Sequence, residues 1–401
     1  MQNSALRFLV GLIGLALGAG VASADEALWR EHMLAAGTAY ERGLYAETER
    51  LLQAALKEGR DFPPEDPRLA STLRNLALLY RLQGRYGEAE PLIQRALAIW
   101  EKAFGPENPA VAAALNTLAL VRHDRGHAAE AERLYRRALA IREKVWGPEH
   151  SEVAWSLNNL GVLYREQARY AKAEPLFLRA VAIWEKVEGL EHPNVAVGLD
   201  NVGGLYRVQG RYPEAELFYR RALAIRIKTR GPDYPEVAGS LNNLGALFLA
   251  QGRYVEAESF LQRALTVSEN AFGPEHPNVA QSLNDLGALR RARGEYAAAE
   301  RLIRRALTMW EKIAGPQHPN VAVTLDNLAA LHQAQGQYAE AEGLYRRSLE
   351  IQEKAVGPEH PSVAATLENY AALLRQANRE TEAAALEGRA SAIRRKHRPE
   401  E

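Results

Sequence analysis

Apolar side chains recur through most of the chain at the spacing of one helix face, in short segments separated by Gly and Pro. Leu157, Leu160 and Tyr164 follow the 0, 3, 7 spacing of an amphipathic α-helix. A second segment with helical spacing covers residues 171–188 and stops at Gly189, because glycine readily closes a helix and the chain then turns. The pattern predicts a pair of helices joined by a short turn.

This pair returns with a constant period. A Gly-Pro-Glu-His-Pro motif recurs every 42 residues, with its glycines at Gly105, Gly147, Gly189, Gly231, Gly273, Gly315 and Gly357. Seven such periods separate Pro67 from Pro361 without an insertion. A fixed period of this length is typical of arrays in which each unit buries its apolar face against its neighbours. We therefore expect an all-α solenoid of about nine antiparallel helix pairs.

Two columns of small residues predict how the helices of a pair pack. The first helices carry Ala77, Ala119, Gly161, Gly203, Gly245, Gly287, Ala329 and Ala371. The second helices carry Ala89, Ala131, Ala173, Ala215, Ala257, Ala299, Ala341 and Ala383. Small side chains let two helix backbones approach closely, so each pair should form a tight hairpin. A larger side chain such as leucine at position 203 should overpack it.

The ends of the chain differ from the repeats. Residues 1–24 have the layout of a secretory signal peptide: Arg7 is the only charged residue, an apolar stretch follows, and Ala22-Ser23-Ala24 is a small-x-small cleavage signal. We expect cleavage after Ala24, no stable membrane insertion afterwards, and a secreted or periplasmic protein. An uncleaved anchor is the alternative.

The mature chain divides into three parts. Residues 25–66 form an N-terminal capping helix pair, residues 67–361 form seven 42-residue repeats, and residues 362–401 form a C-terminal capping pair with a basic tail. Terminal units of an array need polar outer faces to remain soluble, which is why we interpret the degenerate end units as caps.

Composition narrows the function. The 401 residues contain 50 basic and 50 acidic side chains, which argues against nucleic acid as the partner, and no cysteine, which excludes disulfides and thiolate chemistry. Phosphate-loop, His-Glu-x-x-His, Gly-x-Ser-x-Gly and Gly-x-Gly-x-x-Gly motifs are absent. Histidines of the repeated motif lie one repeat apart, too far to share a metal ion, and occupy a helix-capping position. We expect no catalytic residue, metal or cofactor, and so not an enzyme.

One family resembles the repeat closely. Residues Ser156-Leu157-Asn158-Asn159-Leu160-Gly161-Val162-Leu163-Tyr164, with Ala168-Arg169-Tyr170 and Ala173-Glu174, resemble a tetratricopeptide repeat. The 42-residue period and the Gly-Pro-Glu-His-Pro link are similar to the kinesin light chain type. The likeness covers residues 26–397 and includes no heptad coiled coil, so motor function is not carried over. It implies a right-handed superhelix whose first helices line a concave groove for extended peptides.

A polar stripe along the first helices is the candidate site. We number each first helix from its core leucine, so that Leu157 is position 0. Positions 1, 2 and 8 carry the candidate groove residues Asn116, Asn158, Asn159, Arg165, Asn201, Arg207, Asn242, Asn243, Asn284, Arg291 and Asn327. An amide both donates to and accepts from a peptide backbone, and arginine binds carboxylates with two hydrogen bonds. These residues predict binding of an extended, acidic peptide.

Two alternatives stay open. The asparagines can instead bond neighbouring first helices and meet no ligand, and Trp155 is either a binding anchor or a buried packing aromatic. The second functional hypothesis is a structural or oligomerisation component of an extracytoplasmic assembly that uses the convex face. The sequence predicts a protein or peptide partner but leaves its identity and the oligomeric state of the chain open.

Overall fold

The computed structural model describes residues 24–397, and this part of the chain consists of eighteen α-helices and one short 3-10 helix, without strands. The predicted signal peptide lies outside the described residues except for Ala24. The first helices of the repeats are α4 (Pro67–Leu82), α6 (Pro109–Asp124), α8 (Ser151–Glu166), α10 (Pro193–Val208), α12 (Pro235–Ala250), α14 (Pro277–Ala292), α16 (Pro319–Ala334) and α18 (Pro361–Gln376). The second helices are α5 (Tyr86–Phe104), α7 (Ala128–Trp146), α9 (Tyr170–Glu188), α11 (Tyr212–Arg230), α13 (Tyr254–Phe272), α15 (Tyr296–Ala314), α17 (Tyr338–Val356) and α19 (Glu380–His397).

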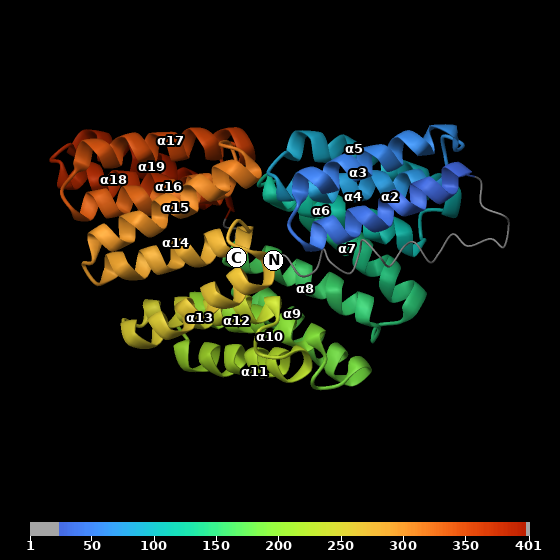
Figure 1. Cartoon of the computed structure of the whole chain (residues 1–401), viewed down its shortest axis with the longest axis horizontal. Coiled ribbons are helices and arrows are strands. Elements are labelled where there is room, and N and C mark those ends of the chain that lie inside the picture. The colour runs from blue at the N-terminus through green and yellow to red at the C-terminus, as the bar shows by residue number, and fades with distance from the viewer. Residues whose placement is uncertain (1–23, 398–401) are drawn as a thin grey trace. The chain divides into compact units, whose positions relative to one another are not determined.

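Helices pair in chain order. The helices α2 (Ala24–Glu41) and α3 (Tyr45–Glu58) form the first pair, and α18 with α19 forms the last of the described pairs. Each second helix also contacts the first helix of the next pair, as α11 does with α12. Figure 1 shows this succession, with α10 to α13 in green and yellow and α14 to α19 in orange and red. The prediction of an all-α solenoid of nine helix pairs is confirmed for the described residues.

The chain separates into two compact units. Their described parts are residues 24–160, called unit 1, and residues 161–397, called unit 2, and the boundary falls inside α8. Each unit is a stack of helix pairs with its own buried side chains. The candidate residues Asn116, Asn158 and Asn159 belong to unit 1, and the remaining candidates belong to unit 2.

Proline, a capping side chain and glycine set the helix ends. Before seven of the eight first helices, all except α12, the preceding residue accepts a hydrogen bond of 2.8–3.2 Å from the backbone N–H two residues later; these residues are Asp66, Asn108, His150, His192, His276, His318 and His360. This satisfies one of the unpaired N–H groups at the helix start. Seven of the second helices, α5 to α17, end at a glycine with φ of 80–96°. The capping interpretation of the histidines is therefore confirmed.

His276 should make stability depend on pH. It is buried, stacks on Phe272 at 3.8 Å, and caps α14 through Nδ1, which accepts from the N–H of Asn278. Burial lowers the pKa of His276 to about 4, below the ordinary value of 6.5. Since the unfolded chain then binds the proton more readily, stability is fully present above pH 6.5 and is lost as the pH falls toward 4, by roughly 1–3 kcal/mol.

The matched variant is His276→Asn, because asparagine caps α6 at the equivalent place and does not titrate. We expect urea unfolding at pH 7.5 and pH 5 to show a smaller acid loss for His276→Asn than for the unchanged chain. Equal losses in the two proteins would contradict a buried neutral imidazole.

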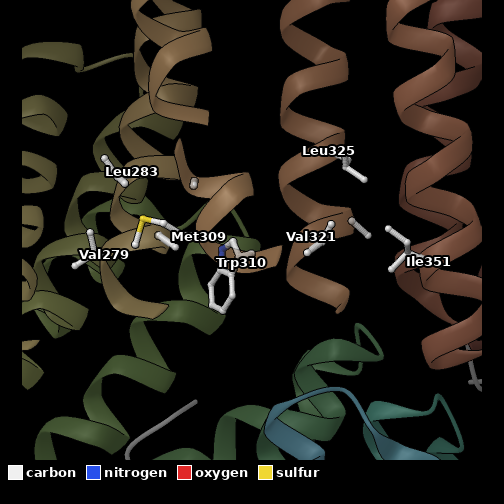
Figure 2. Close-up of a cluster of buried hydrophobic side chains, with 10 residues drawn as sticks. Val279, Leu283, Met309, Trp310, Val321, Leu325 and Ile351 are labelled. Carbon is white, nitrogen blue, oxygen red and sulfur yellow. The ribbon is translucent and has the colours of Figure 1, made fainter. Parts of the chain in front are cut away.

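The interior is a chain of apolar clusters that cross from one repeat to the next. Figure 2 shows one of them, formed by Val279 and Leu283 of α14, Met309 and Trp310 of α15, Val321 and Leu325 of α16, and Ile351 of α17. Within each hairpin, the small column of the first helix meets a large side chain of the second. An ideal Cβ on Gly161 would lie 2.7 Å from Phe177, and one on Gly245 would lie 2.5 Å from Leu261. The close approach expected from the small columns is therefore present.

Ion pairs between repeats run along the second helices. Three lysines of the recurring Glu-Lys pairs, Lys102, Lys144 and Lys312, contact a glutamate that follows proline one repeat earlier, as Lys144 does with Glu107 at 2.5 Å. The arginine of the following second helix contacts the glutamate of the same pair, as Arg137 does with Glu101 at 2.7 Å. These pairs are exposed, so each contributes about 0–1 kcal/mol. The expected solvated charged face is also a link between repeats.

Candidate functional site

Position 1 of the first helices faces the next repeat. Asn159 donates a hydrogen bond from Nδ2 to Oδ1 of Asn116 at 2.8 Å, and Asn242 exchanges hydrogen bonds of 3.2 and 3.3 Å with Ser282. Three of the four candidate asparagines at this position are 4–6% exposed: Asn116, Asn158 and Asn284. These side chains present almost no surface to a ligand. The hydrogen bonds of Asn116 and Asn242 match the alternative in which asparagines join neighbouring first helices.

The same level of the stack contains buried polar layers. In unit 2, Arg226 of α11 is 5% exposed and donates to both Asp200 of α10 and Ser240 of α12. In unit 1, Arg142 is buried and donates to Ser156 at 2.7 Å. Guanidinium groups need such partners when they are buried, since an unpaired buried charge is costly. Position 1 and its neighbours therefore hold consecutive repeats together.

A tryptophan replaces the arginine in other layers. Trp184 of α9 is fully buried, and an ideal Cβ on Gly198 of α10 would lie 3.0 Å from its ring. Gly198 thus lies on the first helix that follows Trp184. At the equivalent place, Ser156 follows Arg142 and Ser240 follows Arg226. Trp155, the candidate anchor of position −2, is 5% exposed. Its burial matches the interpretation as a packing aromatic.

Position 2 is partly exposed on four first helices of unit 2, α10, α12, α14 and α16. The residues here are half-buried side chains on four successive first helices: Asn201, Asn243, Asp285 and Asn327. Position 5, one turn later on the same side of each helix, carries only small residues: Gly204, Ala246, Ala288 and Ala330. Gly204 is buried beneath the guanidinium of Arg165, whereas Ala246, Ala288 and Ala330 leave room beside the amides for a polypeptide backbone to approach. We call positions 2, 5 and 8 of α10, α12, α14 and α16 the first-helix face.

One carboxylate interrupts the amides of this face. Burial raises the pKa of Asp285 to about 6, while a hydrogen bond from Gln281 (2.9 Å) and the charge of Arg207 act in the opposite direction. Asp285 is therefore largely ionised at neutral pH and repels anions next to it.

Position 8 distinguishes the two units. In unit 1, Arg81 pairs with Asp124, which occupies position 9 of the next first helix, at 2.6 Å. Position 9 of α10, α12, α14 and α16 is apolar: Val208, Ala250, Ala292 and Ala334. Arg207 and Arg291 consequently lack the acidic neighbour that Arg81 has, and neither forms an ion pair with any residue between 24 and 397.

The two arginines are nevertheless partly enclosed. Burial raises the pKa of Tyr219 while the nearby charge of Arg207 lowers it, and the Nε of Arg291 is buried without a hydrogen bond among the described residues. Arg165, the third candidate arginine, lies 3.8 Å from Glu166 and places a guanidinium nitrogen over Gly204. The structure thus brings two half-buried cations without acidic partners onto one face of unit 2.

Metal and catalytic chemistry find no support in the geometry. Within residues 24–397, no three His, Asp or Glu side chains gather at a distance that would hold a metal ion. Burial raises the pKa of three carboxyl groups, Glu236, Asp285 and Asp326, which lie on the different helices α12, α14 and α16. Asp326 accepts from the Thr366 hydroxyl at 2.5 Å and belongs to a polar layer between repeats. No helix within the described range is long and apolar enough to span a membrane.

Comparison with known proteins gives a family and a fold. The model of the tetratricopeptide repeat family matches residues 30–97, 68–144, 152–228, 236–312, 286–354 and 320–396. A structure of BtubC (BKLC) from P. vanneervenii is 22% identical, with 63% of this chain and 94% of that chain covered and a TM-score of 0.43. Kinesin light chain TPR-like repeats from Podosopora anserina are 27% identical, with 52% and 98% covered and a TM-score of 0.42.

A third structure matches over a longer span. A Rap protein complexed with competence and sporulation factor is 15% identical and has a TM-score of 0.63, with 93% of this chain and 98% of that chain covered. At this identity the likeness supports the fold alone. The search of curated proteins finds no match.

Proposed function

Because the chain belongs to the tetratricopeptide repeat family, we propose that it is a protein–protein interaction scaffold that binds an extended, acidic peptide on the first-helix face of unit 2. The repeat family supports the scaffold role, and tetratricopeptide arrays typically carry no catalytic chemistry. The groove that the family resemblance implies would be lined by this face. Peptide binding on this face involves no covalent change in the chain or in the peptide.

One observation carries the proposal. Arg207 and Arg291 are half-buried cations, and the next first helix offers them alanine at position 9, where Arg81 meets Asp124. A guanidinium partly removed from water without an ion pair is unfavourable, and a carboxylate from a ligand would supply that pair with two hydrogen bonds. The half-buried amides of position 2, such as Asn243, offer a donor and an acceptor to a peptide backbone. The small position 5 lets that backbone come close.

The test compares two pairs of arginines with the same change in charge. A library of displayed 12-residue peptides is selected on the full chain, and the Kd of an enriched acidic peptide is measured by fluorescence anisotropy. We expect Arg207→Ala with Arg291→Ala to weaken binding about 10- to 100-fold and to flatten its salt dependence.

The control is Arg263→Ala with Arg301→Ala, which removes two exposed arginines from the second helices of the same unit. This control should change the Kd less than about twofold. Equal effects of the two double variants, or a library without acidic enrichment, would contradict the proposed function.

We also propose that the scaffold works outside the cytoplasm. The support is the sequence of residues 1–24, with one charge, an apolar stretch and a small-x-small cleavage signal. The first described helix, α2, begins at Ala24, so cleavage after this residue would leave the helix pair α2–α3 at the start of the mature chain.

A second candidate function uses the opposite helices. Leu217 of α11 and Val255 of α13 are 67% and 80% exposed. The neighbouring second helices carry Pro175 and Ser259 at the place of Leu217, and Pro213 and Ala297 at the place of Val255. Exposed apolar side chains on adjacent helices favour a contact with another protein surface. This supports the structural or oligomerisation role as the alternative to peptide binding.

A further inference from the structure

We infer that the peptide ligand carries two anionic side chains six residues apart, one for Arg207 and one for Arg291, with apolar side chains between them. This inference rests on the proposed function and specifies the ligand of the same face. It follows from how the first helices of unit 2 alternate in chemistry at position 8. No covalent step is involved.

The spacing comes from the stacking of the helices. The first helices α10, α12 and α14 contact one another in succession, and Arg207 and Arg291 stand at position 8 of the outer two. Packed helices lie about 8–10 Å apart, so the two positions are separated by about 16–20 Å. An extended chain advances about 3.3 Å per residue, and side chains on one side recur every second residue. Six residues span about 20 Å and keep both carboxylates on the same side.

The apolar middle comes from α12. Its position 8 is Leu249, half-buried, where the flanking helices carry arginine. Ala246 lies one turn earlier on the same helix and Ala250 follows directly, so this stretch offers no charge to a ligand. Peptide residues two and four places after the first carboxylate face this apolar stretch, where burying them is favourable.

The residues at position 8 on the helices before and after this pair of cations do not extend it. Beyond Arg291, position 8 of α16 is Gln333, which already hydrogen-bonds Gln376 and Tyr345 at 3.1 and 3.2 Å. Before Arg207, position 8 of α8 is Arg165, which has Glu166 at 3.8 Å. From α8 to α16, Arg207 and Arg291 are thus the two arginines of position 8 that face an apolar residue at position 9 of the next first helix and form no ion pair within the described residues.

Asp285 selects where the carboxylates lie. It occupies position 2 of α14, about two turns from Arg291 on the same helix, and it is an acidic group on the face. An anionic side chain placed toward position 2 would be repelled, whereas one placed toward position 8 meets a guanidinium. The ligand therefore crosses the three helices along their position 8 ends.

Three synthetic peptides of equal composition test the spacing. The first contains Glu-x-Leu-x-Leu-x-Glu, the second has the two glutamates adjacent, and the third exchanges the leucines with distant serines. We expect the first to bind the full chain about tenfold more tightly than either of the others.

A substitution on α12 provides the reverse test. Leu249→Arg places a third cation between the two arginines and should remove the preference for the spaced peptide, whereas Leu217→Arg on the exposed side of α11 should leave it unchanged. If all three peptides bind equally while Arg207→Ala with Arg291→Ala weakens each, the spacing is wrong and the proposed function stands. If the double variant changes the affinity of none of them, the proposed function itself fails.

Discussion

Replacing Gly203 by leucine is expected to lower the free energy of unfolding by about 2–3 kcal/mol. Gly203 lies in α10 where the small column meets α11, and an ideal Cβ there would be 2.8 Å from the ring of Tyr219. Tyr219 is 2% exposed, so its ring cannot move aside without disturbing the packing of the hairpin. Urea unfolding followed by circular dichroism measures the loss.

Gly239→Ala is the matched control for this substitution. Gly239 also lies inside a first helix, α12, but no atom outside the local helix backbone is within 4 Å of an ideal Cβ. Alanine favours a helix over glycine by about 1 kcal/mol, so this variant should be equally or more stable. If the Gly203→Leu variant and the unchanged chain unfold at the same urea concentration, the hairpin does not need the close approach.

Replacing Arg226 by alanine is expected to cost about 3–5 kcal/mol of stability, the largest effect among these substitutions. Arg226 is the buried cation of the layer between α11 and α12, and its removal leaves Asp200 without its guanidinium partner. Burial raises the pKa of Glu236, and the nearby charge of Arg226 opposes that rise. Glu236 therefore also loses a positive charge next to it when Arg226 is replaced. Unfolding in urea at pH 7 measures the effect.

A second substitution separates charge from packing. Adding Asp200→Asn to Arg226→Ala removes the uncompensated carboxylate, so part of the lost stability should return. Arg220→Ala breaks an exposed pair with Glu216 on the same helix and should cost less than about 1 kcal/mol. Equal losses for Arg226→Ala and Arg220→Ala would contradict the role assigned to the buried layer.

The sequence predicts the fold because each signal in it is local. The 42-residue period, the proline at the start of the first helices and the glycine after the second helices are readable along the chain, and contacts between repeats only repeat the same geometry. The small columns likewise require only helical spacing. Gly161 beside Phe177 and Gly245 beside Leu261 follow from that spacing alone.

The candidate site is less predictable because it depends on the angle between repeats. A helical wheel places positions 1 and 8 on one side, yet Asn284 is buried between repeats while Arg291 is half-exposed on the same helix. The tilt of each first helix against the next decides this difference, and a single repeat does not contain that information.

A signal for the buried layers is nonetheless present at long range. Second helices alternate between Trp184 and Arg226 one period apart, and the following first helices alternate between Gly198 and Ser240 in step. Position 9 changes from Asp124 in α6 to valine or alanine in α10, α12, α14 and α16, and this change is a second signal of this kind. Reading it requires knowing that position 8 of one repeat meets position 9 of the next, as Arg81 does with Asp124.

A photo-crosslinking amino acid at Ala246, in the middle of the first-helix face, tests the binding surface most directly. The probe is a biotin-labelled peptide containing Glu-x-Leu-x-Leu-x-Glu, and the control places the same crosslinker at Ser259, exposed on α13. Binding along the first helices predicts a covalent product from position 246 and none from position 259. A product from position 259 alone, or from both positions equally, would contradict it.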